Sequence, residues 1–169
     1  MLVEFWMVQR LTREINELEK QMMDKRIQME HYAAYSSALG SASNMGINNL
    51  AGLSAEILPR ASLFAQYADN ASSMSAAQNL QTMKLLGRIP YTGNQMMDMQ
   101  IQTSAYTQFK REALKTLKEQ ETAVLNEKEK EIKLAMNAME IQLSKKKAEL
   151  QAYKDACKEA AKNAAPDFG

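Results

Sequence analysis

Residues 8–39, VQRLTREINELEKQMMDKRIQMEHYAAYSSAL, bring an apolar side chain back at alternating steps of three and four. The positions with this spacing are Val8, Leu11, Ile15, Leu18, Met22, Lys25, Met29, Tyr32, Ser36 and Leu39. Eight of the ten are apolar or aromatic, which is typical of a coiled-coil seam. Because glycine and proline are absent from 1–39, the stretch predicts a helix near 3–38, with Gly40 as its stop.

A second stretch without glycine or proline, 94–165, predicts a helix near 94–164 that Pro166 ends. Two runs within it keep heptad spacing: Leu114, Leu117, Glu121, Val124 and Lys128, and then Ile132, Met136, Met139, Leu143, Lys146, Leu150, Tyr153, Cys157 and Ala160. The runs join at 124–128–132 by consecutive steps of four, a stutter that locally unwinds a left-handed supercoil. The apolar members of these runs and of 8–39 are the predicted seam, or interface.

The start of this second helix carries two capping signals. Thr92 and Gln95 have the spacing of a capping box, in which each side chain accepts a hydrogen bond from a backbone N–H of the first turn. Tyr91 and Met96 occupy the two positions of the hydrophobic staple that accompanies such a box.

The middle segment, 40–93, holds five of the six glycines but only five charged residues. We expect shorter helices near 47–57 and 61–86 within it. A broad apolar stripe on the second consists of Phe64, Tyr67, Ala71, Met74 and Leu80. The alanine, serine and glycine residues of this segment permit helices to approach closely.

These patterns predict an all-α fold, an elongated antiparallel coiled-coil helical hairpin with a small helical head. Residues 1–39 are the first coiled-coil arm, 40–93 the weakly charged head, 94–165 the second arm and 166–169 a short tail. At about 1.5 Å per residue the second helix would reach roughly 100 Å and the first about 55 Å. Part of the longer helix is therefore expected to pack against the middle segment or against another chain.

Residues suited to catalysis or metal binding are scarce. One histidine, His31, and one cysteine, Cys157, cannot provide a zinc site with several His or Cys ligands. Nothing around His31 marks a nucleophile, and most carboxylates lie in charged helix faces. We therefore expect no catalytic, cofactor-binding or metal-binding residues and no small-molecule substrate.

Charge and targeting signals restrict the partners further. The net charge is +1, and the basic cluster Lys145–Lys147 is interleaved with acidic residues, so nucleic acid is not expected as a partner. The chain shows no signal peptide and no run of about 18 apolar residues. The location is therefore unknown, with the cytoplasm as the default and non-classical export left open.

Six residues are candidate partner contacts. Phe5 and Trp6 belong to an apolar N-terminal patch, expected to pack either on the chain's own long helix or on a neighbouring subunit. Met96, Met97 and Met99 lie at the foot of the head, where methionine suits an adaptable contact surface. Phe168 lies in the tail.

Three functions remain open. The leading hypothesis is a non-enzymatic structural or scaffolding protein that self-associates through coiled-coil helices, because the arms are unequal in length. The second is a chaperone-like or adaptor module that binds a client with its Met-rich central region. The third is a membrane-contacting, translocator-type hairpin, which is the weakest because polar groups insert into lipid at a high cost. The expected partner is the chain itself or another protein.

Overall fold

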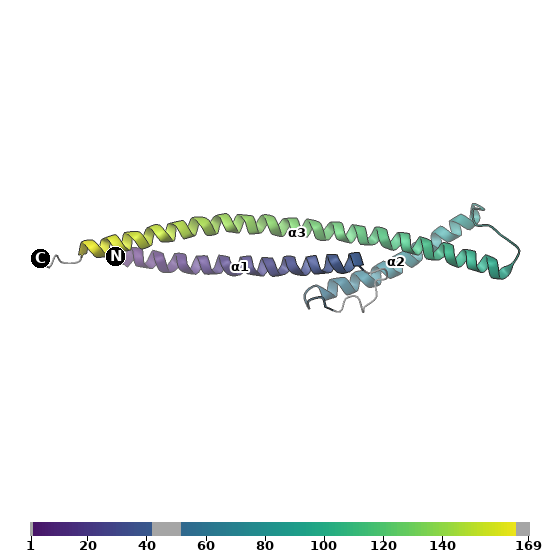
Figure 1. The fold of residues 1–169 in the computed structure, drawn as a ribbon, viewed down its shortest axis with the longest axis horizontal. Helices are drawn as coiled ribbons and strands as arrows, with labels where there is room; N and C mark the ends of the chain where they lie inside the picture. The colour runs from purple at the N-terminus through teal and green to yellow at the C-terminus, as the bar shows by residue number, and fades with distance from the viewer. Residues whose placement is uncertain (1, 42–51, 165–169) are drawn as a thin grey trace. The chain divides into compact units, whose positions relative to one another are not determined.

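A computed structural model describes residues 2–41 and 52–164 (Figure 1). These residues form three helices, α1 (Leu2–Ser41), α2 (Leu58–Leu85) and α3 (Gln95–Ala164). The two described ranges contain no β-strand. The prediction of an all-α, hairpin-like fold is therefore confirmed.

The chain divides into two compact units, and each long helix contributes to both. Among the described residues, the first unit contains 2–30 of α1 and 129–164 of α3. The second unit, 31–128, contains the end of α1, all of α2 and the beginning of α3. The units thus divide each long helix instead of separating the helices from the middle segment.

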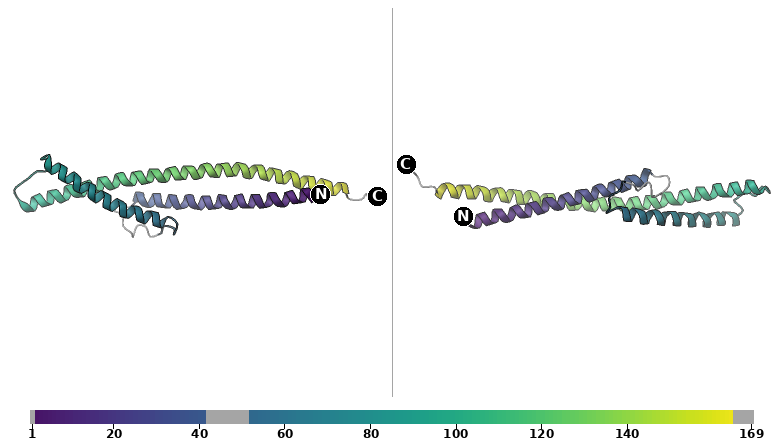
Figure 2. Two further views of the ribbon diagram at one scale, coloured as in Figure 1. Left: turned by 180° about the vertical axis from the view of Figure 1, so that it is seen from behind. Right: turned by 90° about the horizontal axis from the view of Figure 1, so that it is seen from below.

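In the first unit, α1 and α3 run side by side in opposite directions (Figures 1 and 2). Leu11, Ile15 and Ile132 are buried between them. The other predicted seam residues of this unit are half-buried: Leu18, Met22, Met29, Met136, Met139, Leu143, Leu150 and Tyr153. Ion pairs flank this face, one between Lys147 Nζ and Glu19 Oε1 at 2.8 Å and another between Lys146 and Glu14.

The second unit has a core made of residues from all three helices. Its buried cluster consists of Tyr35, Leu39, Ile57, Ala61, Ala65 and Leu125, with Tyr32, Leu53 and Phe64 packed against it. The expectation that α1 stops at Gly40 is corrected, because the helix continues to Ser41. Leu39, which is only 2% exposed, holds the last turn of α1 in place by its burial.

The middle segment contains one described helix. Of the helix expected over 47–57, residues 47–51 lie outside the described residues and 52–57 form turns and irregular backbone. α2 begins at Leu58 rather than at 61, with Pro59 in its first turn. Proline suits that position because the first N–H groups of a helix have no intrahelical partner.

The buried face of α3 is rotated relative to the predicted seam near residue 124. Leu114 is buried and Leu117 half-buried, but Val124 is 41% exposed and Leu125 fully buried. Val124 is therefore not part of the face of α3 that packs within this chain. From Leu125 the buried and half-buried positions follow steps of four and three to Ile132, so the stutter does not fall at 124–128–132. The Tyr35 and Leu39 side chains set this rotation, because Leu125 belongs to their cluster.

α2 ends in a Schellman motif. The N–H of Gly87 donates to the carbonyl of Lys84 and the N–H of Arg88 to that of Met83, both at 3.0 Å. Gly87 has a φ of +65°, the left-handed conformation that this motif requires. The motif stops the helix because the chain leaves the helical path at Gly87.

The cap of α3 differs from the predicted capping box. Asn94 Oδ1 accepts hydrogen bonds from the backbone N–H groups of Met96 and Met97 at 3.1 and 3.4 Å, so Asn94 is the N-cap. Thr92 instead donates its N–H and its hydroxyl to Asp98 Oδ1, at 2.8 and 2.7 Å. These hydrogen bonds lower the pKa of Asp98, whose carboxylate closes the turn.

The predicted hydrophobic staple does not form either. Tyr91 and Met96 are 85% and 81% exposed, so neither side chain covers the other. Instead of a staple, the Thr92–Asp98 hydrogen bonds fix how the chain enters α3.

Candidate interaction surface

The inner face of α2 is made of small side chains. Its buried residues are Ala61, Ala65, Ala68, Ser72 and Ala76, which are separated by steps of four and three. Such steps place them on one side of the helix. Small side chains allow two helix backbones to approach closely, and α2 lies beside the first part of α3 in the second unit (Figure 2).

The charged groups of α2 are all engaged with α3. Arg60 Nε lies 2.9 Å from Glu121 Oε1, and Asp69 Oδ1 lies 2.8 Å from Lys110 Nζ. The third charged residue, Lys84, donates from Nζ to Gln102 Oε1 at 2.7 Å. The sequence of α2 contains no other charged side chain. The remaining outer face is therefore uncharged.

Large apolar residues occupy that outer face. Leu63, Tyr67, Met74 and Leu85 are 69%, 60%, 63% and 82% exposed. At about 100° per residue their directions fall within roughly 40° of one another, opposite the small inner face. We call the whole line the outer stripe, which consists of Leu63, Tyr67, Asn70, Met74, Gln78, Gln81 and Leu85. On these two faces the helix thus buries small residues and exposes large ones.

The ion pair between Arg60 and Glu121 belongs to the packing of the second unit. Burial, and then the negative charge of Glu121, raise the pKa of the buried Tyr35 phenol. The hydrogen bond to Glu121 in turn raises the pKa of Arg60. The phenol therefore stays protonated and the guanidinium stays charged near neutral pH. These fixed states suit a structural interaction rather than proton transfer.

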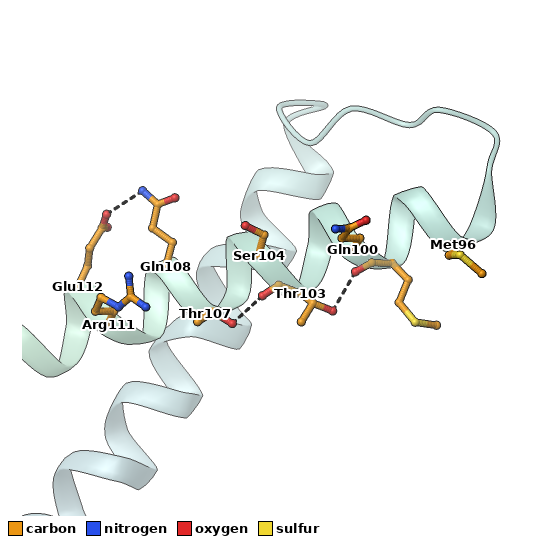
Figure 3. A pocket seen from close by; sticks show the side chains of 9 residues that line it. Met96, Gln100, Thr103, Ser104, Thr107, Gln108, Arg111 and Glu112 are labelled. Atoms are coloured by element: carbon orange, nitrogen blue, oxygen red, sulfur yellow. Dashed lines mark hydrogen bonds between the residues drawn. The ribbon is translucent and has the colours of Figure 1, made fainter. Parts of the chain in front are cut away.

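The methionines at the start of α3 form a second exposed surface. Met96, Met97 and Met99 are 81%, 54% and 64% exposed. Two of them border an open hollow of about 920 Å³ (Figure 3), lined by Met96, Met99, Gln100, Thr103, Ser104, Thr107, Gln108, Arg111 and Glu112.

The polar groups of this hollow are largely bonded within α3. Thr103 and Thr107 donate their hydroxyls to the carbonyls of Met99 and Thr103, and Gln108 donates to Glu112 (Figure 3). Small-molecule sites are usually enclosed by several elements, whereas all the lining residues here come from one helix. The hollow therefore has the character of a surface for another protein.

The N-terminal patch is exposed in the first unit. Val3, Phe5 and Trp6 are 73%, 60% and 57% exposed, so the expectation that they pack on the chain's own long helix is wrong. The guanidinium of Arg10 lies 5.6 Å from the centre of the Trp6 ring, a cation–π contact within the same helix. Phe168, the candidate in the tail, lies outside the described residues.

Sequence reasoning missed Leu63 and Leu85 of the outer stripe and the Asn94 cap. The regular spacing of alanine and serine from 61 to 76 could have revealed which face of α2 packs inward. Asn94 and Asp98 could have been recognised by their position just before and inside the first turn of α3.

Metal and membrane sites can be assessed for 2–41 and 52–164. In these ranges no group of three or more His, Cys, Asp or Glu side chains is placed to hold a metal ion. The helices there also lack the combination of length and apolar character that crossing a membrane requires.

The fold and surface define an all-α protein that exposes large apolar side chains along its helices. No protein-family model, curated protein or solved structure matches the chain. Its function is therefore argued from the chemistry of these surfaces.

Proposed function

We propose that the chain is a non-enzymatic structural or scaffolding protein that self-associates through exposed faces of its helices. The observation that carries this proposal is the outer stripe of α2, where four large apolar side chains are more than half exposed on one face. Exposed apolar area is unfavourable in water by about 25 cal/mol per Å². An exposed face with several large apolar side chains is typical of a protein–protein contact surface.

Exposed apolar residues in the first unit support more than one contact surface. Leu134 and Ile141 of α3, seven residues apart, are 69% and 66% exposed. Met23 and Ile27 of α1 are exposed and border a second hollow with Met22 and Leu143. A protein that contacts its copies through several faces forms an assembly rather than a single closed pair.

The test is the molar mass of the full chain by size-exclusion chromatography with light scattering. Samples should span a roughly hundredfold range of concentration, because association follows mass action. We expect the mass to rise above that of one chain as concentration increases. A mass of one chain, 19.0 kDa, at every concentration would contradict the proposal.

The exposed methionines favour a second candidate function, an adaptor that holds a client protein against the start of α3. Methionine side chains are flexible and polarizable, so they fit varied apolar partners. Changing Met96, Met97 and Met99 together to serine should abolish client capture in pull-downs from native extract. The matched control is Met23→Ser, an equally exposed methionine on α1. Recovery of no specific client by the unmodified chain would remove this candidate.

A further inference from the structure

We propose that two copies of this chain bind each other through the outer stripe of α2, with the two α2 helices antiparallel about a two-fold axis beside Met74. This inference rests on the self-association proposed above and names its surface and its partner. It follows from the charge, the spacing and the direction of the stripe.

The lack of charge on the outer stripe favours an uncharged partner surface. Along the 28 residues of α2, the charged groups interact with α3 and leave the outer stripe neutral. A charged partner face would lose hydration on this stripe and gain no counter-charge. The outer stripe on a second copy is a neutral and largely apolar face of the same length, so the two faces are complementary.

The spacing of residues in the outer stripe is symmetric about Met74. Leu63 lies eleven residues before Met74 and Leu85 lies eleven residues after it. When two such helices run antiparallel about Met74, Leu63 faces Leu85 of the second copy and Met74 faces Met74. Each apolar side chain at the ends and the centre then meets another apolar side chain.

The polar members of the stripe match in the same register. Asn70 faces Gln78 of the second copy, and Tyr67 faces Gln81. Amide side chains both donate and accept hydrogen bonds, so Asn–Gln and Tyr–Gln pairs can satisfy each other. Leu63 and Leu85 are about 33 Å apart along the helix, so the contact extends over about six turns.

The position of Lys84 favours an antiparallel orientation of the two α2 helices. Lys84 lies at the end of α2, and its hydrogen-bond acceptor, the amide of Gln102, leaves its positive charge uncompensated. A parallel pair would bring the two Lys84 ammonium groups to the same end, where they repel. An antiparallel pair places them at opposite ends and also opposes the two helix dipoles.

The direct test is cross-linking of the full chain with a short bis-maleimide reagent. Cys157 is the only cysteine, so Cys157→Ser provides a background without thiols. In that background Met74→Cys should give a covalent dimer. The matched control, Gln120→Cys, lies at an exposed position of α3 outside the proposed contact surfaces and should give far less dimer. Equal yields from the two variants would overturn the proposed axis.

The direction is tested with two further single-cysteine chains, Leu63→Cys and Leu85→Cys, of which one carries a tag that changes its mass. The antiparallel arrangement predicts a mixed dimer between the two chains and little cross-linking of either chain alone. Cross-linking of each chain to itself, without the mixed dimer, would show a parallel arrangement and overturn the proposal.

A substitution separates this inference from the broader proposal of self-association. Met74→Glu places two carboxylates at the two-fold axis, so the α2-mediated dimer should be lost, whereas Gln120→Glu, at an exposed position of α3, should retain it. Helicity by circular dichroism checks that both variants are folded. If the unmodified chain associates and Met74→Glu associates equally well, this inference fails and self-association stands. If the unmodified chain is a monomer at all concentrations, both fail.

Discussion

The two compact units differ in which side chains they bury. In the first unit, large residues spaced by three and four, such as Leu11, Ile15 and Ile132, face the neighbouring helix. In the second unit, α2 turns Ala61, Ala65, Ala68, Ser72 and Ala76 inward, and the large Tyr67 and Met74 outward. Heptad spacing of large residues therefore identifies the packed face of the helices in the first unit but not the packed face of α2 in the second.

The size of the contacting side chains explains this difference. Two faces of large side chains fill the space between helices at an ordinary separation, so periodicity reveals them. A face of alanine and serine brings the backbones closer and gains van der Waals contact between main-chain atoms. Large residues would not fit in that narrower space, and the opposite face of α2 holds them instead.

The largest expected effect tests the core of the second unit. Leu125→Ala should lower the free energy of unfolding by about 2–5 kcal/mol, because it leaves a cavity beside Tyr35 and Leu39. Val124→Ala, at the neighbouring exposed position, should change it by less than about 1 kcal/mol. Urea denaturation measures both. A larger loss from Val124→Ala would restore the seam predicted from heptad spacing.

A substitution on the inner face of α2 tests the role of small side chains. Ala68→Leu should destabilise the protein by about 1–3 kcal/mol, because a buried methyl is replaced by a side chain for which there is no room. Ala77→Leu makes the same change at an exposed position of the same helix and should stay within about 0.5 kcal/mol. If the two variants unfold at the same urea concentration, the inner face is not closely packed.

Two glycine substitutions should act in opposite directions. Gly87→Ala should destabilise the protein by about 1–2 kcal/mol, since alanine resists the left-handed backbone that ends α2. Gly40→Ala lies inside α1, and beyond that helix's own backbone no atom of the described residues comes within 4 Å of the added methyl, so it should stabilise by about 0.5–1 kcal/mol. Thermal unfolding of both variants shows whether each substitution raises or lowers the stability. A loss of stability in Gly40→Ala would contradict the helical assignment there.

The smallest effect concerns pH and the cap of α3. Hydrogen bonds from Thr92 hold the pKa of Asp98 below its ordinary value of 3.8, so its stabilisation is complete above that value. This stabilisation should decline as the pH falls toward the lowered pKa. Asp98→Asn should therefore be less stable than the unmodified chain at about pH 6, and the difference should shrink as the pH falls below 3.8. Urea denaturation at each pH measures this difference.

Much of the fold could be predicted because it depends on neighbours in the sequence. The absence of glycine and proline in 1–39 and 94–165 indicated the two long helices, and α2 corresponds to the helix expected over 61–86. Details that depend on distant residues were predicted less well. Val124 and Leu125 are both apolar, so only the burial of Leu125 with Tyr35 distinguishes them.

The candidate contact surfaces were likewise predicted only in part. Exposure of the methionines at 96, 97 and 99 agrees with their choice as contact candidates, yet Leu63 and Leu85 were not singled out. Their exposure depends on the packing of the opposite face of α2, which involves α3. The alanine and serine spacing of α2 is the sequence signal for its covered face, and the heptad spacing of large residues does not detect it.

The sequence by itself determined that the chain is helical, where its long helices lie, and that charged residues concentrate in the two flanks. These properties arise from local backbone preferences and periodicity within a few turns. The tertiary structure decided the rotation of α3 at Leu125 and that the alanine face of α2 is the covered one. Both depend on contacts between residues far apart in the chain, so the spacing of large residues along the sequence could not fix them.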